Sequence, residues 1–167
     1  MNRREETAKK IADELASNDI KVIASLPDDW ISDLLRAIDN DDRFTHVPVN
    51  REESAVGLCS GAYMSGAGSA ALMGASGFMT LIYAITKINY TYEIPILILV
   101  TLRGAFGDIH QSHLSNGLYM RPVMDAISLP HTIVDKPEDI RLIGQAYKHS
   151  RIFSRPTVVA LTHGLLR

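Results

Sequence analysis

Two adjacent carboxylates, Glu52 and Glu53, stand where a short apolar strand gives way to a helix. The strand is expected over residues 44–49 and the helix over residues 52–65. Open α/β sheets bind ligands beyond the carboxyl ends of their strands, so an acid here can face a binding crevice. Glu53 follows Asn50 by three residues, which predicts a capping box with Asn50 as the N-cap. Glu52 is not needed for that cap, so it either favours the helix dipole or performs chemistry.

The helix that follows these acids is rich in residues that form helices poorly, namely Gly57, Ser60, Gly61, Ser65 and Gly66. Each glycine in a helix costs up to about 1 kcal/mol relative to alanine. Gly57 and Gly61 are four residues apart, so they would present a bare helix face. Such a face suits either close helix packing within the fold or a contact with another subunit, and the sequence leaves both open.

Polar residues also follow two other predicted strands. Residues 74–77 (Gly-Ala-Ser-Gly) join a strand to a helix, where backbone N–H groups can approach an anion. Neither a Walker P-loop nor a GxGxxG pattern is present there. Residues 103–117 follow the most apolar run and are expected to form a long loop, which is typical of a functional segment. Four side chains in this loop could do chemistry: Arg103, Asp108, His110 and His113.

The two loop histidines allow three interpretations. Histidine carries protons near neutral pH, so either ring could act in catalysis. His110 and His113 could instead be two metal ligands, but no convincing third ligand follows nearby. They could also be ordinary solvent-exposed residues.

The hydrophobic pattern alternates helices with strands along the whole chain. Strands are expected at residues 21–26, 44–49, 69–73, 96–102, 131–134 and 157–161, and helices at 5–17, 30–38, 52–65, 78–89 and 137–152. Strands separated by helices indicate βαβ units and a mainly parallel sheet. The sequence therefore predicts an α/β fold with three αβα layers and about six strands, in a single domain over residues 1–167.

Composition argues against several classes of partner. The chain of 167 residues carries 17 basic and 19 acidic side chains, for a net charge of −2, which argues against nucleic acid and against an anionic membrane surface. The single cysteine, Cys59, cannot form an internal disulfide. No apolar run reaches the length of a membrane span, and the N-terminus lacks the apolar region of a signal peptide. We therefore expect a soluble cytoplasmic protein.

Together these residues resemble the pyrimidine-binding (PYR) domain of thiamine diphosphate enzymes, and the resemblance covers nearly the whole chain. It is greatest to the alpha subunits of archaeal sulfopyruvate decarboxylases, with the phosphonopyruvate decarboxylases as near relatives. The matching segments occur in the same order as in the family and comprise residues 25–30, 50–63, 75–77, 102–104 and 155–161.

The resemblance implies that Glu52 is the catalytic glutamate that hydrogen-bonds ring nitrogen N1′ of the cofactor's aminopyrimidine. Glu52 lies nine residues before Gly61, as in the family. Its carboxyl group favours the imino form of that ring, which takes the proton from the thiazolium carbon that attacks a 2-oxo acid. The resemblance further implies cofactor contacts by Pro27, Gly77 and Phe78, catalytic roles for His113 and His110, and substrate binding by Arg103 and Ser76.

Two departures from the family pattern affect the site. Ala75 and Thr80 stand where relatives often have asparagine. The chain also lacks the Gly-Asp-Gly…Asn motif with which the family holds Mg²⁺ and the cofactor's diphosphate. The resemblance therefore implies that this chain holds no metal and forms only half of the thiamine diphosphate site. A separate beta subunit would carry Mg²⁺ and the diphosphate.

The resemblance leaves three functions to distinguish. The first is the alpha subunit of an enzyme that decarboxylates sulfopyruvate, a small anionic 2-oxo acid, to sulfoacetaldehyde in coenzyme M biosynthesis. The second keeps the reaction and replaces the substrate by phosphonopyruvate. The third is a non-catalytic α/β binding or regulatory subunit. The sequence also leaves open whether the isolated chain forms a homodimer and which of His110 and His113 is catalytic.

Overall fold

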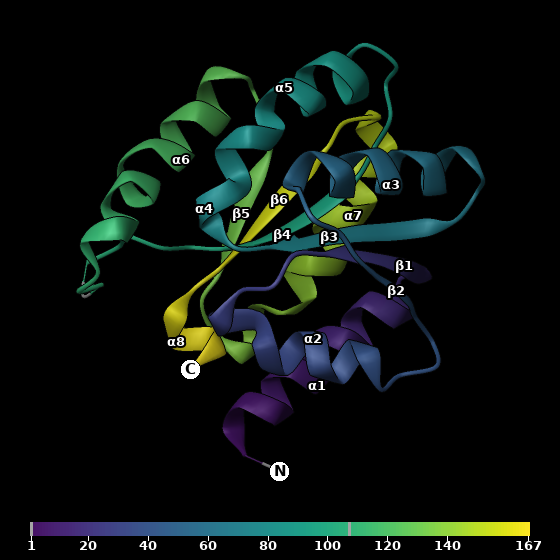
Figure 1. Ribbon diagram of the computed structural model, residues 1–167. Helices are drawn as coiled ribbons and strands as arrows, with labels where there is room; N and C mark the ends of the chain where they lie inside the picture. The colour runs from purple at the N-terminus through teal and green to yellow at the C-terminus, as the bar shows by residue number, and fades with distance from the viewer. Residues whose placement is uncertain (1, 107) are drawn as a thin grey trace.

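Six parallel strands form one sheet in the computed structural model, which describes residues 2–106 and 108–167 (Figure 1). The strands are β1 (Ile20–Ser25), β2 (Thr45–Pro48), β3 (Gly68–Met73), β4 (Leu97–Thr101), β5 (His131–Val134) and β6 (Thr157–Leu161). Their order across the sheet is β2-β1-β3-β4-β6-β5, and every neighbouring pair is parallel. The predicted α/β fold with a six-stranded, mainly parallel sheet is confirmed, and each predicted strand end lies within one residue of the observed one.

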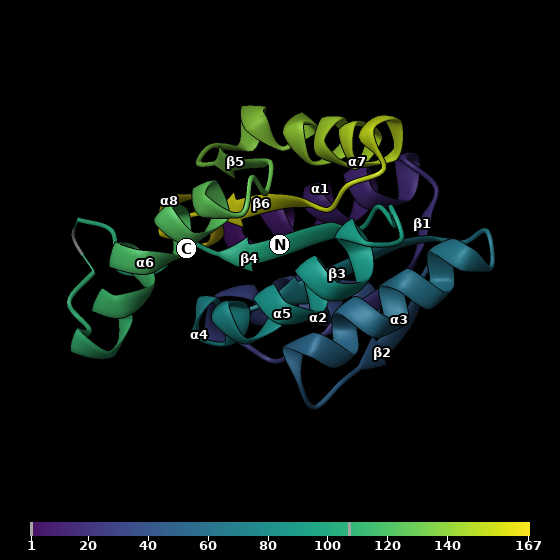
Figure 2. The same ribbon diagram turned by 90° about the horizontal axis from the view of Figure 1, so that it is seen from above.

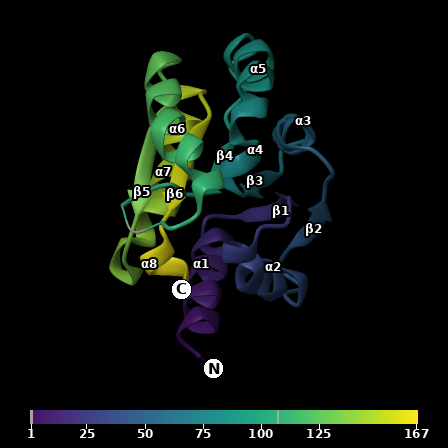
Figure 3. The same cartoon turned by 60° about the vertical axis from the view of Figure 1, so that its left-hand side comes forward.

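Helices cover both faces of the sheet (Figures 1 and 3). One layer contains α1 (Arg3–Ser17), α2 (Ser32–Asp39), α7 (Arg141–Phe153) and α8 (His163–Leu166). The other contains α3 (Glu52–Met64), α4 (Ala75–Phe78), α5 (Ile82–Ala84) and α6 (Leu114–Ala126). Among the described residues, no helix combines the length and the apolar character needed to cross a bilayer.

The alternation of side chains along each strand divides the interior into two cores. In β3, Ala71 and Met73 belong to the core beneath α3, α4 and α6, whereas Ala70 and Leu72 belong to the core beneath α1, α2 and α7. All six residues of β3 and all five of β4 are buried. These central strands are apolar throughout because helices cover both of their faces.

Two helical segments differ from the sequence-based expectation. The helix predicted over residues 78–89 starts earlier, at Ala75, and continues through a 3₁₀ turn and α5 into a π-helical segment, Ile85–Tyr90. The loop predicted over residues 103–117 is wrong in its second half, where a 3₁₀ turn leads into α6. Gly117 and Pro122 lie inside α6, and this helix exposes Leu118 and Tyr119, so its sequence lacks a clear amphipathic pattern.

Because all strands run in the same direction, their carboxyl ends meet at one edge of the sheet. In Figure 2 the β4 arrow points toward the side on which α6 and the segment before it lie. The loops after β1, β3, β4 and β6 therefore converge at this carboxyl edge. Ligands of open parallel sheets bind at this edge.

Candidate active site

A buried ion pair joins the loops that follow β1 and β4. Arg103 Nη2 donates to both carboxylate oxygens of Asp28, at 2.9 and 2.8 Å, and the two side chains are only 9% and 12% exposed. The Arg103 guanidinium carbon lies 3.9 Å from the ring centroid of Trp30, whose backbone N–H donates to Asp28 at 2.9 Å. Arg103, which the resemblance assigns to the substrate, thus shares its charge with Asp28.

We expect Arg103→Met to reduce the free energy of unfolding by about 3–5 kcal/mol, because removing one partner strands a buried charge. Urea unfolding of the isolated chain measures this loss. Arg43→Met is the control, because Arg43 pairs with Asp41 and Asp13 but is 48% exposed. Exposed pairs contribute at most about 1 kcal/mol. Equal losses in the two variants would contradict the importance of the Asp28–Arg103 pair.

Asp28 also closes the space between the ends of β1 and β3. A Cβ atom added to Gly74 would lie 2.4 Å from Asp28 Oδ2, so this carboxylate rests directly on the glycine backbone. The chain passes from β1 to β2 on one side and then to β3 on the other, which makes this position a topological switch point. Gly74 is required here because any larger residue would displace the carboxylate.

Glu52 is the first residue of α3, and the predicted capping box is wrong. The N-cap is Arg51, which has an extended backbone (φ −149°, ψ 148°). Its side chain makes no capping hydrogen bond with the helix. Helix α3 therefore begins one position later than a cap at Asn50 requires. Glu53 is its second residue, and Ser54 occupies the third position, where the capping glutamate was expected.

The carboxylate of Glu52 lies against the backbone of Gly77 in α4. A Cβ atom added to Gly77 would lie 1.6 Å from Glu52 Oε1 and 1.8 Å from its Cδ. Glu52 is half-buried, and its carboxylate makes no hydrogen bond or ion pair with another described residue. The fold therefore places an acid at the carboxyl edge and leaves its oxygens free for a ligand.

The other residues assigned to the cofactor or substrate by resemblance differ in accessibility. Pro27 and Ser76 are exposed at the carboxyl edge, in the loop after β1 and in α4. Phe78 is fully buried in the core beneath α3, backbone included, so the cofactor contact expected of Phe78 is not accessible in this structure. Ala75, which stands in place of asparagine, donates its backbone N–H to Thr101 Oγ1 at 3.0 Å and thereby fixes the start of α4 on β4.

The two loop histidines lie side by side near Trp30. The ring centroids of His110 and His113 are 5.0 Å apart, and that of His113 is 6.4 Å from Trp30. His113 Nδ1 contacts both carboxylate oxygens of Asp108, at 2.8 and 3.0 Å. Sequence reasoning placed Asp108 in this loop but gave it no role, because an acid five residues before a histidine matches no general motif.

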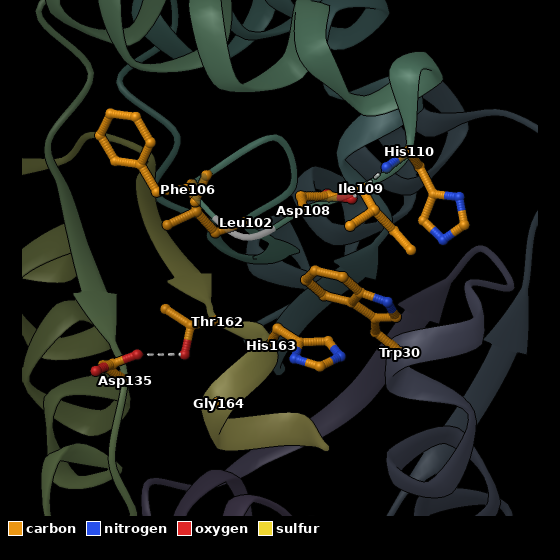
Figure 4. Close-up of a pocket in the computed structure, with 11 residues that line it drawn as sticks. Trp30, Leu102, Phe106, Asp108, Ile109, His110, Asp135, Thr162, His163 and Gly164 are labelled. Carbon is orange, nitrogen blue, oxygen red and sulfur yellow. Dashed lines mark hydrogen bonds between the residues drawn. The ribbon is translucent and has the colours of Figure 1, made fainter.

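A cavity of about 540 Å³ opens beyond the carboxyl ends of β4, β5 and β6 (Figure 4). It is lined by Trp30, Leu102, Ala105, Phe106, Asp108, Ile109, His110, Asp135, Thr162, His163 and Gly164. On one side the rings of Trp30 and His163 are 4.8 Å apart, and on the other Thr162 donates to Asp135 at 2.6 Å. Within the part of the chain that the structure describes, no three metal-ligating side chains come together.

Contacts between neighbouring residues connect Glu52 to the histidines. Glu52 touches Gly77 in α4, and Gly74 just before α4 touches Asp28. From Asp28 the ion pair continues to Arg103, whose guanidinium stacks on Trp30 beside His113. The structure thus brings the residues of four separate loops to one edge of the sheet.

Residues 5–118 match the sequence family described as thiamine pyrophosphate enzyme, N-terminal TPP binding domain. The chain belongs to this family of thiamine pyrophosphate enzymes. In this TPP-binding domain the carboxylate of Glu52 has no hydrogen-bond or ion-pair partner among the described residues. Thiamine pyrophosphate and thiamine diphosphate are two names for the same compound.

Curated relatives of this TPP-binding domain carry one enzyme name. The chain is 29% identical to the sulfopyruvate decarboxylase subunit alpha of Methanococcus maripaludis, over 96% of this chain and 95% of the relative. It is 30% identical to the subunit of the same name from Methanocaldococcus jannaschii, over 87% of this chain and 86% of the relative. A Methanosarcina acetivorans protein named sulfopyruvate decarboxylase is 26% identical over 92% of this chain but only 39% of its own length.

Proposed function

We propose that this chain is the alpha subunit of a thiamine diphosphate-dependent decarboxylase that converts sulfopyruvate into sulfoacetaldehyde and CO₂ for coenzyme M biosynthesis. The observation that carries the proposal is the carboxylate of Glu52, which lies against Gly77 at the carboxyl edge and has no partner among the described residues. The names of the relatives from Methanococcus maripaludis and Methanocaldococcus jannaschii supply the substrate.

In this proposal Glu52 shares a proton with ring nitrogen N1′ of the pyrimidine. The bound cofactor supplies the nucleophilic carbon and the electron sink that decarboxylation requires. Glu52 is the first residue of α3, which follows β2, so its carboxyl group lies at the carboxyl edge of the sheet. The lack of a side chain at Gly77 lets that group lie close to the α4 backbone.

The anionic substrate is assigned to the groups beyond β3, β4 and β6. The exposed hydroxyl of Ser76 can donate a hydrogen bond, and the cavity beside Trp30 offers the imidazoles of His110 and His163. In this reading Arg103 orients the substrate as part of its pair with Asp28. The ion pair leaves the Arg103 guanidinium charged, and Asp28 compensates a cation that would otherwise be buried alone.

A partner subunit completes the proposed site and carries Mg²⁺ and the diphosphate. The word "subunit" in the relatives' names supports this, and so does the Methanosarcina acetivorans relative, most of whose length lies outside the match. Helix α3, which begins with Glu52, also has an exposed face without large side chains at Gly57 and Gly61. A Cβ atom on Gly57 or Gly61 would meet no atom of a described residue within 4 Å, and nearby Tyr83 of α5 is 74% exposed.

We expect Gly57→Gln to weaken association with the partner subunit without destabilising the isolated chain. Gln is a better helix former than Gly by up to about 1 kcal/mol, and open space surrounds this position. Unfolding by urea and co-purification with the partner measure the two effects. Lys9→Gln is the control that should leave association unchanged, because Lys9 is an exposed residue of α1 in the opposite helix layer. Undiminished association of Gly57→Gln would place the interface elsewhere.

The proposed function is tested by co-expression with a candidate beta subunit and an assay of CO₂ release with Mg²⁺ and thiamine diphosphate. Sulfopyruvate and phosphonopyruvate are compared at equal concentrations. Faster turnover of sulfopyruvate is the expected result. Faster turnover of phosphonopyruvate would overturn the substrate assignment. A stable complex that turns over neither compound would overturn the enzymatic function and favour a regulatory subunit.

A further inference from the structure

Asp108 is the one acid in the sequence between β4 and α6, and it is heavily hydrogen-bonded. Its carboxylate accepts the backbone N–H groups of Gly104 at 2.9 Å and of His110 at 3.1 Å, in addition to its two contacts with His113 Nδ1. The Asp108 side chain is only 7% exposed. Burial raises the pKa of Asp108, but the hydrogen bonds from Gly104, His110 and His113 outweigh it and lower that pKa to about 2.

The charge of Asp108 determines which nitrogen of His113 carries a proton. A carboxylate that is ionised at neutral pH can only accept hydrogen bonds, so Nδ1 of His113 must be the donor. The other ring nitrogen, Nε2, makes no hydrogen bond with any described residue. Nε2 is therefore the position at which this ring can take up or release a proton.

The backbone of His113 is packed against Gly104, in addition to the hydrogen bonds that hold its ring. Gly104 has a φ of +73°, and a Cβ atom there would lie 2.2 Å from the carbonyl oxygen of His113 and 2.6 Å from the nitrogen of Gly117. The start of the loop therefore packs directly on the first turn of α6. The side chain of His113 is 16% exposed.

His110 lacks this support. Its backbone N–H is bound by Asp108, but its side chain is exposed and makes no hydrogen bond with a described residue. A group that transfers protons needs a defined orientation and a defined tautomer. Of the two neighbouring rings, only His113 has both, whereas His110 lines the cavity beside Trp30 but has no hydrogen bond from its ring to a described residue.

We propose that Asp108 is a positioning residue that keeps the proton of His113 on Nδ1, and that His113 rather than His110 is the proton-transferring histidine of the site. The chemical step rests on the proposed function. Loss of CO₂ from a 2-oxo acid leaves an electron pair on the former carbonyl carbon, and one proton must form the new C–H bond of the aldehyde. His113, when doubly protonated, gives up the Nε2 proton and keeps the one on Nδ1; solvent then restores it.

The assignment of the tautomer is tested by ¹⁵N NMR of the full chain labelled at histidine, without any assay of activity. His113→Gln identifies the His113 signals. In the wild-type chain at neutral to mildly alkaline pH, we expect the neutral ring to carry its proton on Nδ1. A proton on Nε2 in the wild type would overturn the proposal, whatever the substrate of the enzyme is.

Asp108→Asn then tests the role of the carboxylate. The Asn amide can donate as well as accept, so we expect the Nδ1 preference of His113 to be lost. The matched control is Asp39→Asn, because Asp39 contacts His46 Nδ1 at 2.6 Å and lies on α2. That control should change the His46 signals and leave those of His113 in place. An unaltered His113 tautomer in Asp108→Asn would overturn the positioning role.

Kinetics of the complex with its partner separate the two histidines. We expect His113→Gln to reduce kcat at least about 100-fold and Asp108→Asn at least about 10-fold, since general acid–base catalysis contributes roughly 10²–10⁴-fold. The loss in His110→Gln should be smaller than in either. An equal or larger loss in His110→Gln would overturn the choice of His113. An inactive wild-type complex would count against the proposed function and leave the tautomer result standing.

Discussion

Glu52→Gln is expected to reduce the kcat of the assembled complex at least about 100-fold, while the chain still folds and still binds its partner. Gln has the shape of Glu but cannot exchange a proton with a ring nitrogen, and such proton transfer contributes roughly 10²–10⁴-fold. The carboxylate has no other described partner, so its replacement breaks no ion pair in the fold. Steady-state kinetics and urea unfolding of the same preparation measure both effects.

Glu53→Gln is the matched control for this experiment. The structure removes the capping role expected for Glu53, since Arg51 is the N-cap and no side chain caps α3. What remains is a helix-dipole contribution of about 0.3–1 kcal/mol, so kcat should stay near the wild-type value. Wild-type activity in Glu52→Gln would refute the catalytic role of Glu52. Loss of activity in Glu53→Gln alone, with folding intact, would show that the two acids are exchanged.

Gly77→Ala is expected to remove most of the activity by displacing the Glu52 carboxylate. The added methyl group would occupy the place where Glu52 Oε1 now lies, at 1.6 Å. A displacement of about 1 Å at a reacting group can cost about 100-fold in rate. In the isolated chain we expect a loss of about 1–3 kcal/mol in the free energy of unfolding, which is typical of overpacking.

A double-mutant cycle tests the contact without any assay of activity. In a Glu52→Ala background the side chain that meets the new methyl group is absent, so Gly77→Ala should cost little stability. The coupling between the two substitutions should therefore be about as large as the cost of Gly77→Ala alone. If the two substitutions were additive, Glu52 would not rest on Gly77 in solution, and the precise placement of its carboxylate would be refuted.

Hydrophobic patterning was sufficient to predict the sheet. β5 and β6 match the expected ranges to the residue, because apolar runs bounded by turn residues mark strands well. α6 could not be predicted in this way. Gly117 and Pro122 disfavour a helix in isolation, and α6 forms through tertiary contacts such as the packing of Gly117 on Gly104.

The candidate site was only partly accessible from sequence. The position of Glu52 at the end of a strand and the presence of two histidines in one loop could be predicted from spacing. The contacts that orient these residues could not, because they join distant segments. Asp28 and Arg103 are 75 positions apart, and nothing in the local sequence of either residue indicates the other. The carboxylate of Glu52 likewise meets Gly77 only because α3 and α4 cover the same face of the sheet.

The Asp28–Arg103 pair also constrains how this site can evolve. Either residue alone cannot be exchanged for an apolar one without stranding its partner's charge, whereas replacement of both by well-packed apolar side chains is often tolerated. Homologous sequences should therefore vary at these two positions jointly. Trp30 should follow them, because its ring has a cation to stack on only while the arginine is kept.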